Sequence, residues 1–591
     1  MHRPVPETRR PAGASPRDAV PRHPAPAGAA RRRAGTAVFL LVLAALFTAY
    51  LRLSRTYPEN SDEANILLMA SDLAHGNLLL SGWNVSDVPF ITTELPEIAL
   101  LVRLFGLRLD TAHIAAALTY TVVVALALLL ARGQARGPRA VTRMAVALAI
   151  LLAPQPGVGV FVMIFSVGHI GTAAPVLLAW LVLDHWPPAA SAGRRRWWWW
   201  PAVVGGLLAW ALLADPLVLV IAIAPVLAVC ALRVAPGLLS RLQNGSGHHH
   251  PRPALAGYGR EASLAVAAAA AYLVAWCGGR LLRAAGGYTQ PPVPFTLDAA
   301  GTWYGHARTV THGLLEMFGA FFIPGNAINY LGPGDYVAAP PLSGLSEAVA
   351  VTRLGCVALA AAGAAVVARR FFRRDADLVS QLLLAGIVAN LAAYIPSSLA
   401  GHTALNAREF APVLPFAAVL AARALGDRLG ARAAAGRVLA AVLVALFGWY
   451  CAGLAHQAAA PAAPDPFARL AAFLRQHDLA SGIGGYWDAS AITVDTGGAV
   501  TVRAVTQGCL QPYAWESKPA WYDPAARTAS FVLESSGTGY FGQWRAAPAA
   551  LRRLGPLLPA AGHALLHPGD GYTVRAYRGN LLAQLPRLAG C

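Results

Sequence analysis

Long apolar runs alternate with short polar connections over most of the 591 residues. A run that crosses roughly 30 Å of hydrocarbon as an α-helix needs about 20 apolar residues. Eleven candidate runs lie at about residues 36–53, 111–131, 141–155, 160–183, 198–214, 216–233, 261–283, 345–368, 379–399, 409–425 and 436–455. The pattern predicts a multi-pass α-helical membrane protein with about eleven transmembrane helices.

Composition supports a membrane protein, and the charge then predicts its topology. Hydrophobic residues make up 56% of the chain and charged residues 13%, against about 25% charged residues in soluble domains. The net charge of +18 would suggest nucleic acid as the partner of a soluble protein. Here the arginines gather in alternate connections, as the positive-inside rule expects of cytoplasmic loops. These connections are residues 132–143, 194–196, 233–260, 369–374 and 423–437. We therefore predict membrane lipids and no nucleic acid as partners.

This topology divides the chain into three parts. Residues 1–35 are rich in Pro, Ala and Arg and predict a disordered cytoplasmic tail. Residues 36–456 form the predicted transmembrane domain, whose two large connections, 54–110 and 284–343, lie outside. An odd number of helices with the N-terminus inside also places residues 457–591 outside. We expect the protein in the cytoplasmic membrane of a bacterium.

Residues 457–591 predict a small extracytoplasmic α/β domain, because none of their apolar runs is long enough to cross a membrane. A helix is expected over 467–477. The stretches Ile492–Asp495 and Val500–Val505 alternate around Gly497-Gly498 and predict a β-hairpin. Further strands are predicted at 531–533 and 572–577.

Two of the six cysteines, Cys509 and Cys591, lie in this outer region. An oxidising compartment permits a disulfide between them. The sequence leaves open whether it forms.

The first outer connection contains a cluster of carboxylates, whereas the predicted membrane domain is otherwise poor in acids. Its members are Asp62, Glu63, Asp72, Asp87, Glu94 and Glu97. Apolar residues at helical spacing follow Asp62-Glu63, and Gly76-Asn77 predicts the end of that helix. One interpretation is structural, with Ser61-Asp62 capping a surface helix whose first turn favours acids. The other is a catalytic carboxylate.

A resemblance favours the catalytic interpretation. A first helix with its N-terminus inside, then Ser61-Asp62-Glu63-Ala64, then an Ala-rich helix ending in His75-Gly76-Asn77 resembles the start of the GT-C superfamily of membrane glycosyltransferases. This superfamily includes the protein O-mannosyltransferases and the bacterial lipid A aminoarabinose transferases. The segment Asn406–Pro415 is similar to its Arg-aromatic-x-x-Pro-x-x-Pro segment. The hexapeptide Thr92–Glu97 departs from the Pro-Pro-Leu-like turn of the family, and resembles a loop of uncharacterised actinobacterial membrane proteins.

The resemblance implies an inverting hexosyl- or pentosyltransferase. Such an enzyme moves a sugar from a polyprenyl-phosphate donor to a hydroxyl of an envelope glycan, lipid or protein on the outer face. Asp62 would be the general base, Glu63 would orient the base or the acceptor, and these two roles could be exchanged. Arg408 and His402 would bind the donor phosphate.

Four more residues are candidates for contacts with the acceptor or substrate: Glu94, Glu97, His169 and Trp83. We expect no metal and no other cofactor, although a divalent ion stays an alternative because some GT-C enzymes require one. Two other functions stay open. One is a transporter or flippase, which the loop position of the acids and the lack of an internal repeat disfavour. The other is an inactive GT-C-like scaffold that binds cell-envelope material.

Overall fold

The computed structural model describes most of the chain beyond its first 25 residues. The described residues are 26–152, 168–187, 199–243, 258–292, 295–320, 328–329, 336–337, 344–373, 375–400, 404–429, 434–536, 543–555, 557, 565–569 and 571–585. Two compact units divide the chain, residues 1–46 and 47–591. Helix α1 (Pro26–Ser54) begins in the first unit, inside the tail predicted over 1–35, and ends in the second. The second unit holds every later element.

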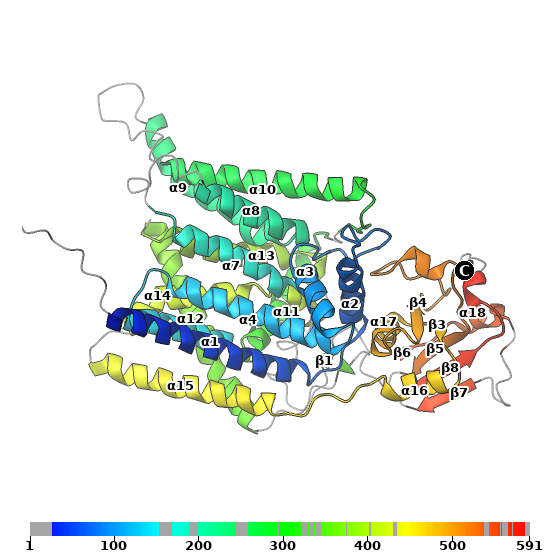
Figure 1. The fold of residues 1–591 in the computed structure, drawn as a ribbon. Helices are drawn as coiled ribbons and strands as arrows, with labels where there is room; N and C mark the ends of the chain where they lie inside the picture. The colour runs from blue at the N-terminus through cyan, green and yellow to red at the C-terminus, as the bar shows by residue number, and fades with distance from the viewer. Residues whose placement is uncertain are drawn as a thin grey trace, which may run out of the picture. The chain divides into compact units, whose positions relative to one another are not determined.

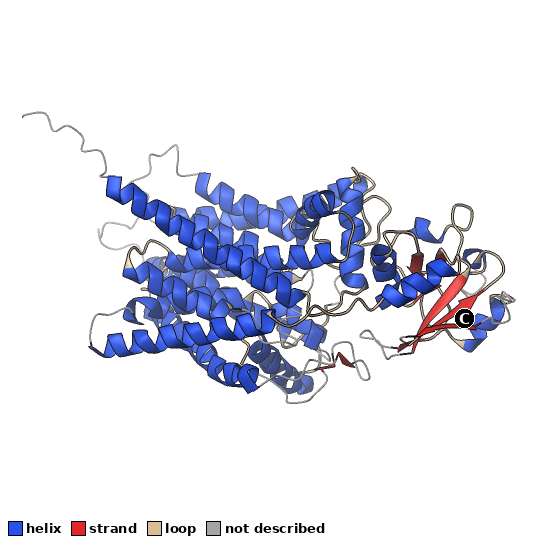
Figure 2. Ribbon diagram, turned by 60° about the horizontal axis from the view of Figure 1, so that its bottom comes forward, coloured by secondary structure: helices blue, strands red, loops and turns tan. Residues whose placement is uncertain are grey.

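Most of the second unit is helical (Figures 1 and 2). Its helices before residue 460 are α2 (Ser61–Ala74), α3 (Glu94–Phe105), α4 (Asp110–Arg132), α5 (Pro138–Leu151), α7 (His169–Asp184), α8 (Trp199–Ala214), η2 (Leu219–Ile223), α9 (Ala224–Gln243), α10 (Gly259–Ala284), η4 (Ala300–Thr302), α11 (Trp303–Met317), α12 (Gly344–Arg373), α13 (Leu378–Tyr394), η5 (Ser398–Ala400), η6 (Ala404–Phe410), α14 (Val413–Leu429) and α15 (Ala434–Ala458). Two short strands, β1 (Ile328–Asn329) and β2 (Tyr336–Val337), pair between α11 and α12.

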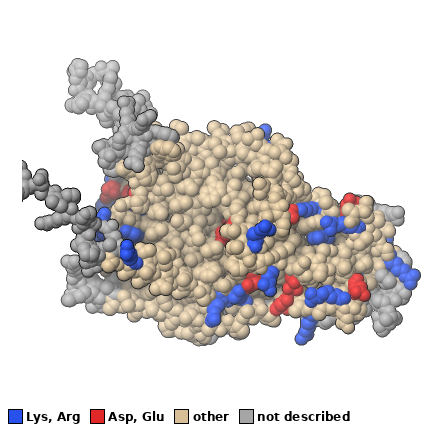
Figure 3. Space-filling model, viewed as in Figure 1, with Lys and Arg blue, Asp and Glu red and all other residues tan. Residues whose placement is uncertain are grey.

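Seven helices in the described part are long and apolar enough to cross a membrane, and three shorter apolar ones accompany them. The three shorter helices are α7, α8 and α13. Few charged side chains interrupt the middle of the helical surface seen in Figure 3. The structure is therefore that of a membrane protein, and the total of about eleven spans stays a prediction.

Helix α14 lies at the centre of the helical packing, with 83% of its apolar window buried. It packs against α4, α5, α12 and α13, while α8, α9 and α10 lie side by side at one edge (Figure 1). Gly363 lets α12 approach α14 closely, because a Cβ at that position would lie 2.6 Å from the Cα of Ala421. Small residues permit such backbone contacts between membrane helices. This packing fixes η6, the turn that precedes α14.

Helix α2 follows the predicted pattern but starts from a different cap. Asn60, not Ser61-Asp62, is the N-cap: its Oδ1 accepts from the Asp62 N–H at 2.7 Å. Glu63 Oε2 in turn accepts from the Asn60 N–H at 3.0 Å, which completes a capping box. The helix ends before Gly76, whose φ of +99° suits glycine. Asp62 is thereby fixed in the first helical turn.

The C-terminal part contains a sheet, drawn red in Figure 2. Its elements are α16 (Ala468–Gln476), β3 (Ser481–Gly484), α17 (Tyr486–Asp495), β4 (Thr501–Ala504), η7 (Pro519–Tyr522), β5 (Phe531–Ser536), β6 (Gln543–Trp544), α18 (Pro548–Arg553), β7 (Leu565–Gly569), β8 (Tyr572–Ala576) and η8 (Leu581–Ala583). The strand order is β4-β3-β5-β8-β7, and β6 pairs with β5. Strand β3 is parallel to β4 and β5, and the other pairs are antiparallel.

The hairpin predicted around Gly497-Gly498 is wrong. Residues 492–495 form the last turn of α17, and β4 pairs with β3 in parallel, so α17 is a crossover helix. The two glycines have φ values of +60° and +84° and follow the helix, where glycine commonly ends it. Strands β5 and β8 do occupy the predicted positions near 531 and 572.

The C-terminal part shares a hydrophobic core with the connection between α1 and α4. Helix α17 packs on α2, and one buried cluster includes Ile66 and Leu95 as well as Ile492 and Phe531. The Ser61 Oγ accepts from the backbone N–H of Ser490 at 3.0 Å. The position of Asp62 therefore depends on both parts of the chain.

Candidate functional site

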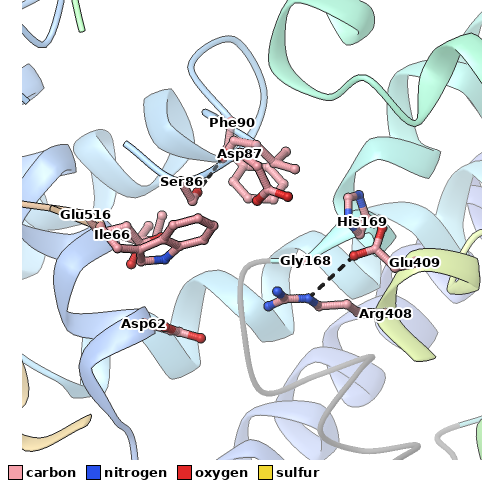
Figure 4. Close-up of a pocket in the computed structure, with 12 residues that line it drawn as sticks. Asp62, Ile66, Ser86, Asp87, Phe90, Gly168, His169, Arg408, Glu409 and Glu516 are labelled. Atoms are coloured by element: carbon pink, nitrogen blue, oxygen red, sulfur yellow. Dashed lines mark hydrogen bonds and ion pairs between the residues drawn. The ribbon is translucent and has the colours of Figure 1, made fainter. Parts of the chain in front are cut away.

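A cavity of about 490 Å³ lies where five segments of the second unit meet (Figure 4). Its lining comes from α2, the loop between α2 and α3, the start of α7, η6 and the connection after β4. The lining residues are Asp62, Ile66, Ser86, Asp87, Val88, Phe90, Gly168, His169, Arg408, Glu409, Trp515 and Glu516. Carboxylates thus outnumber the cationic groups that face this space.

Asp62 and Arg408 face each other in this cavity. In Figure 4 the Asp62 carboxylate extends from α2 and the Arg408 guanidinium from η6, each toward the other. Burial raises the pKa of Asp62, while the Arg408 charge and a hydrogen bond from Tyr486 oppose that rise. The first turn of α2 also favours a negative charge. The arrangement keeps a half-buried carboxylate beside a cation that can bind an anion.

His169 links Arg408 to the surrounding helices. Its Nδ1 lies 2.6 Å from Asp215 Oδ2 and its Nε2 lies 2.9 Å from Glu409 Oε2. Carboxylates on both ring nitrogens satisfy a doubly protonated imidazolium. Glu409 Oε1 lies 3.9 Å from the Arg408 Nε. This chain of charges fixes Glu409, which places a carboxylate beside the guanidinium.

A larger and mainly apolar cavity of about 990 Å³ adjoins the first one. The two share Asp87, Val88, His169 and Glu409. The remaining lining is Asp215, Pro216, Leu217, Leu219, Val220, Phe295, Asn390, Ala393, Tyr394, Ser397 and Leu399. Together the two spaces suit an amphiphilic molecule, because a charged group would face Arg408 while an apolar chain contacts the second lining.

Three acids that the sequence proposed as site residues lie outside the lining of either cavity. Glu63 is buried and forms the capping box, so it orients the helix that carries Asp62. Glu94 is buried against Gly171 of α7 and accepts from the Thr93 hydroxyl, and burial raises its pKa to about 8. Glu97 Oε2 accepts from the Thr119 hydroxyl at 3.0 Å. Glu94 therefore contacts α7, and Glu97 contacts α4.

Trp83 does not line the cavity either. Its indole is 1% exposed, its Nε1 donates to Asp72 Oδ2 at 2.8 Å, and its ring meets Trp521 edge-on at 5.1 Å. The Lys518 Nζ lies 5.1 Å from the ring centroid and pairs with Asp72. Trp83 therefore joins the first connection to the C-terminal part.

His402 and Cys591 lie outside the described residues, so the predicted phosphate contact and the disulfide with Cys509 stay predictions. Within the described ranges, no group of three or more His, Cys, Asp or Glu side chains is arranged to hold a metal ion. The metal requirement stays a prediction as well.

Sequence reasoning did not assign Asp87, Asp215, Tyr486 and Glu516 to the site. Asp215 lies in the Asp-Pro turn between two apolar runs, and a carboxylate at such a turn was a usable signal. Tyr486 and Glu516 lie far along the chain in a region without periodicity around them. Only the fold brings these two to Asp62.

The fold of this chain is similar to that of two solved structures of one bacterial protein. ArnT from Cupriavidus metallidurans, an aminoarabinose transferase, has this fold in its apo crystal structure, with a TM-score of 0.51 and 13% identity over 92% of this chain and 98% of that one. A second ArnT structure, bound to undecaprenyl phosphate, has a TM-score of 0.51 and 12% identity, and the match covers 93% of this chain and 99% of that one. At such identities the likeness shows the fold alone.

A third structure is an oligosaccharyltransferase of Archaeoglobus fulgidus tethered to an acceptor peptide. It covers 85% of this chain and 69% of that one at 13% identity, and its TM-score of 0.44 carries no argument. No family model matches the sequence, and no curated protein matches it.

Proposed function

We propose that the protein is an integral membrane glycosyltransferase. It would move a hexose or pentose from a polyprenyl-phosphate donor to a hydroxyl acceptor at the outer face of the membrane, with inversion at the anomeric carbon. The observation that carries the proposal is the pairing of Asp62 with Arg408 across one cavity that adjoins a larger apolar cavity.

Each feature supports one requirement of the reaction. The acceptor oxygen attacks the anomeric carbon and loses its proton to Asp62, which acts as the general base. The bond between the anomeric carbon and the phosphate oxygen breaks, and its electron pair stays on the phosphate. Arg408 stabilises the negative charge that develops there. Glu409 and His169 keep the guanidinium oriented.

The apolar cavity would accept part of the donor's hydrocarbon chain. Leu217, Leu219, Val220 and Phe295 supply an apolar wall next to Glu409 and His169. The ArnT structure with the same fold was solved with undecaprenyl phosphate bound. A lipid with a phosphate headgroup is the donor class that this chemistry recognises.

The test compares envelope glycans and glycoproteins of a deletion strain carrying the wild-type chain, Asp62→Asn or Asp110→Asn. Asp110 is a matched control: it pairs with Arg55 at 2.6 Å on the surface, where such pairs contribute little. We expect the wild type and Asp110→Asn to restore the parental profile, and Asp62→Asn to fail at equal membrane abundance. Full restoration by Asp62→Asn would overturn the proposed enzymatic function and would favour the inactive scaffold.

A further inference from the structure

The hydroxyl of Tyr486 lies between two carboxylates that both line the candidate site. It is 2.7 Å from Asp62 Oδ1 and 2.8 Å from Glu516 Oε2. Asn65 Nδ2 lies 3.4 Å from both the hydroxyl and Glu516 Oε2. Tyr486 begins α17 and Glu516 follows β4, so both come from the C-terminal part, whereas Asp62 and Asn65 belong to α2.

This geometry requires a proton beyond the one that the phenol carries. A hydroxyl donates one hydrogen bond and accepts through its lone pairs, so it can donate to only one of the two carboxylates. If both were ionised, one of them would face a lone pair at less than 3 Å, and the two charges would repel through a poorly solvated gap. Two carboxylates sharing a site avoid this when one of them stays protonated.

We propose that Glu516 holds this proton and donates it to Tyr486, whose own hydroxyl proton is donated to the ionised Asp62. Glu516 and Tyr486 are then positioning residues of the base, in a relay that runs from Glu516 to Tyr486 to Asp62. The effect of this relay on catalysis rests on the proposed function. The protonation of Glu516 does not depend on that function.

The surroundings place the proton on Glu516 and the charge on Asp62. Arg408 faces Asp62 from η6, and the first turn of α2 favours an anion there. Glu516 is only 6% exposed, and burial and the Asp62 charge raise its pKa to about 8. Further acids surround the pair: Glu59 before α2, Glu63 in its first turn, Asp87 in the cavity lining and Tyr513 against the Tyr486 ring. The nearby cations have carboxylate partners of their own, His169 with Asp215 and Glu409, and Lys518 with Asp72. A second negative charge is therefore disfavoured.

The relay explains how the base can be both oriented and free to react. Tyr486 contacts Asp62 Oδ1, which leaves Oδ2 to take the proton of an acceptor hydroxyl. A neutral Glu516 also avoids a further negative charge in the cavity that must receive a donor phosphate. When Glu516 ionises, it competes with Asp62 for the Tyr486 proton, so the base loses its hydrogen bond. Activity should therefore fall as pH rises through about 8.

Infrared titration of the full-length protein tests the shared proton without any substrate. We expect a protonated-carboxyl band that disappears with a midpoint near pH 8, and that is missing in Glu516→Gln. Burial also raises the pKa of Glu94 to about 8, so Glu94→Gln is the control. It should remove a carboxyl band that is distinct from the band lost in Glu516→Gln. Wild-type and Glu516→Gln spectra that coincide across this range would overturn the proposal.

Transfer assays then test the relay in catalysis, with a panel of synthetic undecaprenyl-phosphate hexoses and pentoses as donors. Glu516→Gln keeps an N–H donor for Tyr486 but cannot ionise, so its pH–rate profile should lack the decline above pH 8, whatever its rate at neutral pH. Glu516→Ala and Tyr486→Phe should lose about 10- to 100-fold, part of what a positioned base contributes. If Asp62→Asn abolishes transfer while Glu516→Ala matches wild type, the relay is wrong and the proposed function stands. If the infrared band behaves as expected but no Asp62-dependent transfer is found, the proposed function fails and the shared proton stands.

Discussion

Replacing Arg408 tests the charge balance of the candidate site most directly. Arg408→Gln keeps a polar side chain but removes the one guanidinium among the described lining residues, where Asp62, Asp87 and Glu409 also lie. A hydrogen bond from a charged donor contributes about 1.5–3 kcal/mol. Losing it should weaken the binding of a phosphate headgroup about 10- to 150-fold. The unpaired carboxylates would repel the phosphate further, so the upper end of this range is expected.

The measurement is the affinity of purified, detergent-solubilised protein for undecaprenyl phosphate, by native mass spectrometry or fluorescence titration. Arg408→Lys keeps the charge without the planar fork and should fall between wild type and Arg408→Gln. Arg55→Gln is the matched control, since Arg55 pairs with Asp110 at the surface. Affinity of Arg408→Gln within twofold of the wild type would refute the assignment of the phosphate to Arg408.

Three further experiments test the helix packing, a buried acid and the two cysteines. Gly363→Ala should lower the melting temperature, because its Cβ would meet the α14 backbone and overpacking costs about 1–3 kcal/mol; Gly206→Ala, with nothing within 4 Å, should not. Burial raises the pKa of Asp488 from 3.8 to about 7, so its contribution to stability is complete below about pH 4 and is lost as pH rises through 7. In Asp488→Asn the melting temperature should fall less between pH 4 and pH 7 than in the wild type. The same dependence of melting temperature on pH in both proteins would contradict this. If Cys509 and Cys591 pair, non-reducing peptide mapping should recover them as one linked peptide that reductant separates.

The helical part could be predicted from the sequence because lipid imposes one simple pattern on it. The long apolar runs match helices such as α4, α10 and α12 within a few residues. In the C-terminal part, the local pattern of apolar and polar residues was not enough to predict the secondary structure correctly. The sequence Ile492–Asp495 is too short to distinguish a strand from the last turn of a helix, and Gly497-Gly498 suits a helix end as well as a hairpin turn.

The candidate site could be predicted only where a motif marks it. Resemblance selected Asp62 and Arg408, which lie far apart in sequence and face each other in the structure. Trp83 was selected as an aromatic that could stack on a sugar, but an indole in a loop does not reveal from sequence that it is 1% exposed. Tyr486 and Glu516 have no local signal, since their position against α2 comes from long-range packing of α17.

If the cavity binds a phosphate lipid as proposed, its carboxylates limit how that lipid can bind. Asp62, Asp87 and Glu409 share the lining with Arg408 and His169, and a phosphate headgroup would add negative charge to the same space. Burial and the Glu409 charge already raise the pKa of Asp87, so this carboxyl is poised to take a proton when an anion enters. Binding of the donor and uptake of a proton are then thermodynamically linked. After the sugar has been transferred, the phosphate lipid would therefore be released more readily as pH rises, because these acids ionise.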